Sequence, residues 1–415
     1  MGVVAPNGIG LDQFHKAQSA GKSGIKKIDL FEELKFSCQV GGIPEVTEEL
    51  LQQFFTPLEL RMIDSSGIKY GVIAGLQAWG DAGLEIDKED NNYDHGIIFG
   101  AGISGVDKFR DAIYKVDKLN VRRLGSTVVI NTMTSGVSAF LSGEIGAGNQ
   151  VTTNSSACVT GTESIGMAYE RIRAGQAIRI LAGSCSEDGP YIWGGFDAMR
   201  VMNYKSNDKP EAASRPMSQT AGGFIPGSGA GAMVLETLES AMNRNATIYA
   251  EIVGHHTNSG GHRKGGTMTA PNGHAVQRCI VETIKAAGVS TSEIDYINGH
   301  LTATSKDAFE LENWKVALGL NPQDFPLINS TKSTIGHCLS AAGSIESVAT
   351  VLQMKHSVVY PSINCEDLNT EILKLLPESS VNKSLHDKEI DIAIKASFGF
   401  GDVNGALLFR KYKDQ

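Results

Sequence analysis

The chain has 415 residues, 41% hydrophobic and 20% charged, which is typical of a globular protein with two or more domain-sized units. A net charge of −9 without a basic run argues against a nucleic-acid-binding protein, and no apolar run approaches the roughly 18 residues of a membrane span. The six cysteines form no CxxC pair, which favours reduced thiols in the cytoplasm over disulfides or a metal site.

Strands and helices are predicted to alternate along the chain. The first half has expected helices over 11–20, 50–55, 70–82 and from Val159 onward, and strands over 95–102, 151–156, 178–183 and 232–235. The second half has expected strands over 248–253, 294–298, 326–329, 392–397 and 404–409, and helices over 273–287, 307–318 and 343–355. This alternation predicts an α/β fold with largely parallel sheets.

Two stretches of the sequence echo each other. NSSACVTGTESIGMA and NSTKSTIGHCLSAAGSIESVA both run from Asn-Ser through a loop into a helix of small residues. Equivalent helices near Val159 and Gly343 would suit a duplicated fold with an internal two-fold axis. We therefore predict two similar halves, 1–245 and 246–415, that meet at a linker over 241–246.

Cys158 lies between the predicted strand 151–156 and the helix that begins at Val159. A cysteine at a helix start is close to unpaired N–H groups and to the positive end of the helix dipole, which favours the nucleophilic thiolate. The alternative is an inert cysteine that packs as a small hydrophobic residue.

Three further polar stretches each follow a predicted strand, where open α/β sheets carry their sites. They contain His300 in NGHLTAT, Lys332 and His337 in KSTIGH, and Phe400 in SFGFGDVN. Taken singly, each histidine could be structural, and the FGFG turn could be an ordinary tight turn with core aromatics.

Together, Cys158, His300, Lys332, His337 and FGFG in this order resemble β-ketoacyl-[acyl-carrier-protein] synthases, most of all the type II elongating, synthase-II-like enzymes. YGVIAGLQAWGDAG, AASRP and GSGAGAMVLE extend the resemblance over almost the whole chain. It implies a thiolase-like fold, a duplicated five-layered α-β-α-β-α architecture with an internal pseudo-two-fold. It also implies a decarboxylative condensation of a malonyl thioester with an acyl group.

The resemblance assigns the catalytic roles. Cys158 would carry the acyl group, and the N–H groups of Cys158 and Phe400 would stabilise the oxyanion. His300 and His337 would donate hydrogen bonds to the malonyl thioester oxygen. Lys332 would organise the site with Glu310 as its partner.

Substrate and partner contacts also follow from the resemblance. The threonines Thr302 and Thr304 would bind the phosphopantetheine arm of acyl carrier protein, so no permanently bound cofactor is expected. The acyl tunnel would be lined by Ile103, Phe196 and Phe400, and the carrier protein would dock on Arg61, Arg122, Arg123 and Arg200. A cytoplasmic homodimer is expected, with a heterodimer of two ketosynthase-like subunits as the alternative.

Two departures from the family pattern stand out: Leu301 and Asp402 occupy positions where glycine is usual. Leu301 would narrow the pantetheine channel, and both changes favour a specialised pathway such as polyene synthesis. They also motivate an alternative, a non-catalytic acyl-binding or chain-length-factor-like subunit. A thiolase is disfavoured because FGFGDVNG lacks a second reactive cysteine.

Overall fold

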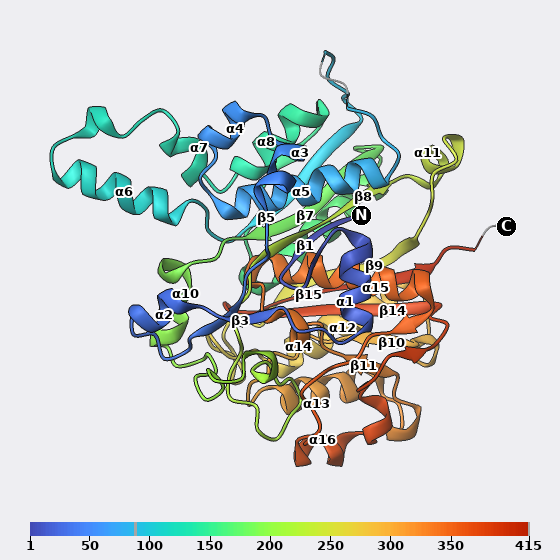
Figure 1. Ribbon diagram of the computed structural model, residues 1–415. Helices are drawn as coiled ribbons and strands as arrows, with labels where there is room; N and C mark the ends of the chain where they lie inside the picture. The colour runs from blue at the N-terminus through green and yellow to red at the C-terminus, as the bar shows by residue number, and fades with distance from the viewer. Residues whose placement is uncertain (87–88, 414–415) are drawn as a thin grey trace.

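Two β-sheets organise residues 1–86 and 89–413, the part of the chain that the computed structural model describes (Figure 1). The first sheet has the order β2 (Gly8–Ile9), β1 (Gly2–Ala5), β8 (Gly229–Glu236), β7 (Arg179–Ser186), β5 (His95–Ala101) and β6 (Val151–Thr152). The second has the order β11 (Leu327–Asn329), β10 (Tyr296–Asn298), β14 (Ile392–Gly399), β15 (Val403–Lys411) and β9 (Ala250–Ser259).

The two sheets share one topology. In the first, β7 and β6 flank β5 in parallel, and β8 runs antiparallel to both β7 and β1. In the second, β14 and β11 flank β10 in parallel, and β15 runs antiparallel to both β14 and β9. Apart from the short β2, the equivalent strands of the two halves therefore have the same order and the same directions in the two sheets. This match confirms the predicted duplication.

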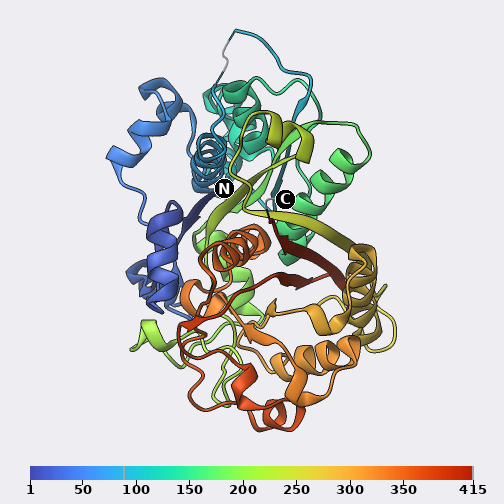
Figure 2. The same cartoon turned by 90° about the vertical axis from the view of Figure 1, so that its right-hand side faces the viewer.

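Two central helices, α9 (Thr160–Arg173) and α15 (Ala342–His356), lie between the sheets (Figure 2). They touch through glycines: a Cβ on Gly161 would lie 2.4 Å from the backbone nitrogen of Ser344, and one on Gly343 would lie 2.4 Å from that of Thr162. Only glycine permits this approach of the two backbones. The helices thus form a buried middle layer that brings both halves to one site.

Each central helix is also hydrogen-bonded to a strand of the other half. Ser344 on α15 pairs with Ser184 on β7 at 2.7 Å, and Thr162 on α9 pairs with Ser397 on β14 at 2.9 Å. The pairs are equivalent under the internal two-fold, because β7 and β14 hold the same place in their sheets.

Further helices cover the outer faces of the sheets. The helices α5 (Ser66–Asp81) and α8 (Gly136–Ile145) lie on the first sheet, and α12 (Gly273–Ala287) and α13 (Asp307–Leu318) lie on the second (Figure 1). Ser65 caps α5 by accepting the Ile68 N–H at 3.2 Å. These outer helices complete the predicted five layers.

The prediction of largely parallel sheets is wrong, because β8 and β15 each run antiparallel to both of their neighbours. Of the neighbouring strand pairs in the two sheets, five are antiparallel and four are parallel.

The bounds of the predicted elements agree with the structure except at two places. The strand expected over 151–156 is limited to the two residues of β6, because the following residues turn toward Cys158. β6 lies at the edge of its sheet, and Val151 is exposed. Half of the linker expected over 241–246 is helical, since α11 (Leu238–Asn243), which is capped by Thr237, extends into it. Within the described residues, no helix has the length and apolarity that a membrane crossing requires.

Candidate active site

Cys158 lies in a single 3₁₀ turn (Ala157–Val159) directly before α9, and Ala157 adopts a left-handed φ of 49° to make that turn. The Cys158 side chain lines a cavity of about 690 Å³. The same cavity is lined by His300, His337, Phe398 and Phe400, which come from the second half of the chain. The four motifs that the sequence analysis singled out therefore converge on one space.

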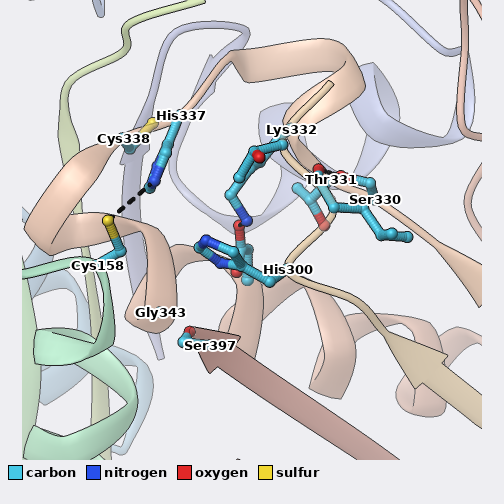
Figure 3. A network of polar contacts seen from close by, with 12 residues as sticks. Cys158, His300, Ser330, Thr331, Lys332, His337, Cys338, Gly343 and Ser397 are labelled. Carbon is cyan, nitrogen blue, oxygen red and sulfur yellow. Dashed lines mark hydrogen bonds and ion pairs between the residues drawn. The ribbon is translucent and has the colours of Figure 1, made fainter. Parts of the chain in front are cut away.

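His337 is the closest of these groups to the cysteine, with its Nε2 atom 3.1 Å from Cys158 Sγ (Figure 3). The Leu339 N–H donates to His337 Nδ1 at 3.2 Å. Because Nδ1 accepts this hydrogen bond, the neutral ring must carry its proton on Nε2. The proton therefore points toward the sulfur and toward any oxygen that takes its place.

His300 completes the cluster. Its ring centroid lies 5.3 Å from that of His337, edge to face, and the reactive atoms of Cys158, His300 and His337 all lie within 4.8 Å of one another. Burial, followed by the charge of Lys332, holds the pKa of both histidines well below 6.5. Both imidazoles are neutral at pH 7. The same spacing would also admit a metal ion, so the expectation of no metal stays a prediction.

The predicted thiolate at Cys158 is not the resting state. Burial raises the pKa of this thiol to about 11, which outweighs the opposing effects of Lys332 and of two backbone N–H groups. Those N–H groups belong to Phe400 and to Cys158 itself, the two predicted oxyanion donors, and both lie near the sulfur. The helix start therefore supplies donors for developing charge but does not ionise the cysteine.

We expect alkylation of Cys158 by iodoacetamide to accelerate about tenfold per pH unit up to nearly pH 11, because only the thiolate reacts. The raised pKa fixes the sign, since the reactive fraction grows as the pH rises toward it. Mass spectrometry of the labelled peptide measures the rate. A plateau near pH 7 would contradict the assigned pKa.

Lys332 pairs with Glu346, so the prediction that Glu310 is its partner is wrong. Glu346 on α15 receives Lys332 Nζ on one oxygen and Lys395 Nζ, at 2.9 Å, on the other. Lys332 begins the short helix α14 (Lys332–Ile335), and the side chains of all three charged residues are at most 2% exposed. The sequence signal for Lys395 was a single lysine inside the apolar strand IAIKASFG.

Glu346→Ala should destabilise the fold by about 3–5 kcal/mol, because it would leave two buried ammonium groups without their shared carboxylate. Urea unfolding measures this loss. Glu312→Ala, at an exposed position of α13, is the matched control and should change stability by less than about 0.5 kcal/mol. Equal stability of the two variants would contradict the triad's role.

Glu310 supports the site in a different way from the one predicted. Its carboxylate accepts the N–H groups of His300 and Leu301, both at 2.7 Å, and burial raises its pKa to about 7. Asp307, which the sequence analysis missed, similarly accepts the N–H groups of Thr302 and Ala303. These two carboxylates fix the loop that carries His300.

Leu301 does not narrow the pantetheine channel as predicted. Its φ is +21°, a conformation that favours glycine, and its side chain is fully buried in the core with Leu311 and Trp314. The neighbouring Thr302 and Thr304 do line the cavity, and their hydroxyl oxygens lie 3.1 Å apart. The departure from glycine is accommodated by the core and leaves the cavity wall unchanged.

Asp402 fastens the FGFG turn to the loop over 260–272. Its carboxylate accepts the N–H groups of His262 at 3.0 Å and Asn272 at 2.7 Å. The Gly401 N–H also donates to the Met268 carbonyl at 2.8 Å. The aspartate therefore holds the turn that carries Phe400 instead of blocking the site.

The remaining predicted residues fall into two groups. Ile103 and Phe196 line the cavity, and the ring of Phe196 lies 6.2 Å from that of Phe400. The four arginines are exposed on separate elements: Arg61 on α4 (Pro57–Met62), Arg122 and Arg123 after α6 (Val106–Asp117), and Arg200 after α10 (Pro190–Ala198). Their docking role stays a prediction.

Comparison with known proteins agrees with this geometry. Residues 1–241 match the family model of the beta-ketoacyl synthase N-terminal domain, and residues 249–366 match that of the C-terminal domain. A curated relative, 3-oxoacyl-[acyl-carrier-protein] synthase 2 of Vibrio harveyi, is 34% identical over 99% of this chain and 97% of its own length.

Two solved structures cover 99% of this chain and 98% of their own. A beta-ketoacyl synthase from Burkholderia phymatum has a TM-score of 0.91 at 25% identity. A ketosynthase of a type II polyketide synthase, bound to the hexaketide and in complex with its acyl-carrier protein, has a TM-score of 0.86 at 26% identity. On its sequence and its fold, the chain belongs to the β-ketoacyl synthase family.

Proposed function

We propose that this chain is a 3-oxoacyl-[acyl-carrier-protein] synthase that elongates acyl chains in fatty-acid or polyketide-type synthesis. The observation that carries the proposal is the convergence of Cys158, His300 and His337 within 4.8 Å in one cavity. Cys158 attacks an acyl thioester, the carrier's S–C bond breaks, and the thiol proton ends on the carrier sulfur. Malonyl thioester then loses CO2, and the resulting carbanion attacks the acyl carbonyl carbon on Cys158. The Cys158 S–C bond breaks, the sulfur takes a proton from water, and the chain leaves on the carrier two carbons longer.

The neutral histidines suit the decarboxylation step. Charge develops on the malonyl thioester oxygen as CO2 leaves, and hydrogen-bond donors already in place stabilise that charge. The Nε2 proton of His337 points into this space, and His300 faces the same point. The N–H groups of Phe400 and Cys158 serve the separate oxyanion of acyl transfer.

The proposal is tested by incubating the protein with acyl-carrier and malonyl-carrier thioesters. We expect an acyl adduct on Cys158 by intact-protein mass, CO2 release, and a β-ketoacyl product. A folded protein that forms no adduct would support the non-catalytic subunit instead. No observation favours that alternative, because Leu301 packs in the core and Asp402 supports the FGFG turn.

The carrier is proposed to be an acyl carrier protein whose phosphopantetheine arm passes Thr302 and Thr304. Both threonines line the same cavity as Cys158, and their hydroxyls can bond the amide groups of such an arm. The substrates therefore arrive on the partner, and no permanently bound cofactor enters the proposed reaction.

Charge reversal of Arg122 and Arg123 to Glu should slow carrier association roughly tenfold or more at low salt, because exposed charges mainly steer encounter. The matched control is the double charge reversal of Lys411 and Lys413, near the C-terminus. Stopped-flow binding at several salt concentrations measures the effect. Association rates that match the wild type would remove both arginines from the docking surface.

Assembly, compartment and domain limits are also proposed. A homodimer along the edge strand β6 is supported by the exposed Val151 of that strand and by exposed apolar side chains on and just after α6, including Phe109, Ile113 and Leu119. A heterodimer is the alternative.

All six cysteines are free, which supports a reducing cytoplasm. We place the boundary between halves at 245/246, between α11 and β9.

A further inference from the structure

Two groups of residues line the cavity around Cys158, and the part of the cavity beside each group is called an arm here. One is formed by the loop that carries Thr302 and Thr304 and would receive the carrier's arm. The other extends along the ends of β5 and β7 and along α10, where Ile103, Ile192 and Phe196 supply an apolar wall. Under the proposed function, this second arm holds the acyl chain.

Glu187 interrupts that apolar wall. It lines the cavity directly after β7 and is only 5% exposed. One carboxylate oxygen accepts the Ser65 hydroxyl and the Gly105 N–H at 2.8 Å, whereas the other has only a long contact of 3.3 Å from the Val106 N–H. Burial raises the pKa of Glu187. The second oxygen therefore has unused capacity to accept a hydrogen bond.

Ser186 adds a second polar group to the same wall. Its side chain is 4% exposed, and its Oγ atom has no hydrogen-bond partner among the described residues. A buried hydroxyl without a partner costs free energy, so such groups are uncommon. A purely hydrocarbon chain in this arm would leave Ser186 without a partner and the second oxygen of Glu187 with only the long Val106 contact.

We infer that the acyl chain taken by this enzyme carries a hydroxyl group, which Glu187 and Ser186 bind in the acyl arm of the cavity. A hydroxyl on the chain can donate a hydrogen bond to the second carboxylate oxygen of Glu187 and accept one from the Ser186 hydroxyl. A carboxylate on the chain would be repelled by Glu187 and by the adjacent Asp188. Aliphatic and phenolic hydroxyls share the required chemistry. The inference rests on the proposed function, because it assumes that Cys158 is acylated.

The test compares Cys158 acylation by three kinds of carrier thioester: plain acyl chains, chains with a terminal aliphatic hydroxyl, and chains with a terminal phenol, over a series of lengths. We expect the wild type to prefer one hydroxylated kind over the plain chain of matched length. Glu187→Met, which keeps the volume but loses the acceptor, should reduce that preference roughly ten- to a hundredfold. Glu187→Gln, which retains an oxygen, should keep more of it.

Two variants separate substrate binding from helix support, since Glu187 also bonds the first residues of α6. Ser186→Ala removes the unpartnered hydroxyl without touching α6 and should reduce the preference several-fold with no loss of Tm. Ser65→Ala removes a donor to Glu187 and also the cap of α5, so it should lower Tm and slow both substrates alike.

The outcomes separate the two proposals. Efficient acylation by plain chains with no preference for a hydroxyl would overturn this inference and leave the proposed function standing. Equal effects of Glu187→Met on plain and hydroxylated chains would also overturn it, by reducing Glu187 to a structural role. Failure of every thioester to acylate Cys158 would contradict the proposed function and this inference with it.

Discussion

Replacing Cys158 with alanine is expected to abolish the acyl-enzyme and to lower condensation by roughly 10⁴–10⁶-fold, as for other covalent nucleophiles. Malonyl decarboxylation should persist, because the neutral histidines remain in the cavity. Intact-protein mass measures the acyl adduct, and trapped CO2 measures decarboxylation. The split between the two readouts is the diagnostic result.

Cys279→Ala is the matched control, since this cysteine is fully buried in α12 and does not line the cavity. It should retain both activities. Cys158→Ser is a weaker test, because its hydroxyl can still be acylated slowly. An acyl adduct on the Cys158→Ala protein would show that another residue is the nucleophile.

The histidine variants should show the opposite result: decarboxylation is slowed and acylation of Cys158 is partly retained. His300→Ala and His337→Ala are each expected to slow decarboxylation about 10²–10³-fold, the usual cost of losing one donor to a developing oxyanion. Acylation of Cys158 should survive in part, because the N–H groups of Cys158 and Phe400 remain beside the sulfur. The same two assays, run on both variants, measure the effect.

His356→Ala serves as the control, because His356 stacks on His15 away from the cavity. It should decarboxylate malonyl carrier at the wild-type rate. Full decarboxylation by both His300→Ala and His337→Ala would refute the donor roles, however well the motifs match the family.

Much of the fold could be predicted because its signals are local. The helices over 273–287 and 307–318 match α12 and α13 to the residue, since apolar residues recur at helical spacing and Asn272 caps α12. The buried strands also agree within a few residues. Cys158, His300 and His337 were expected in a single site because their order resembles that of the β-ketoacyl synthases, and their places after predicted strands were compatible with a site.

The features that the sequence did not predict depend on contacts between residues far apart in the chain, which no local sequence pattern encodes. Glu346 and Lys395 pair only because α15 lies against β14, whereas Glu310 was assigned to Lys332 by resemblance to the family. The thiolate prediction failed for a similar reason. A helix start can be read from the sequence, but the burial that raises the pKa of Cys158 to about 11 depends on tertiary packing around the site.

The exchange of hydrogen bonds between the two halves has a consequence for synthesis on the ribosome. Ser184 cannot form its hydrogen bond to Ser344 until that residue has been synthesised, 160 residues later. At roughly 5–20 residues per second, β7 spends about ten to thirty seconds without α15, which covers the inner face of the first sheet together with α9. Contacts this distant in sequence also slow folding. The nascent first half is therefore the species most exposed to aggregation, and the one on which a chaperone would act.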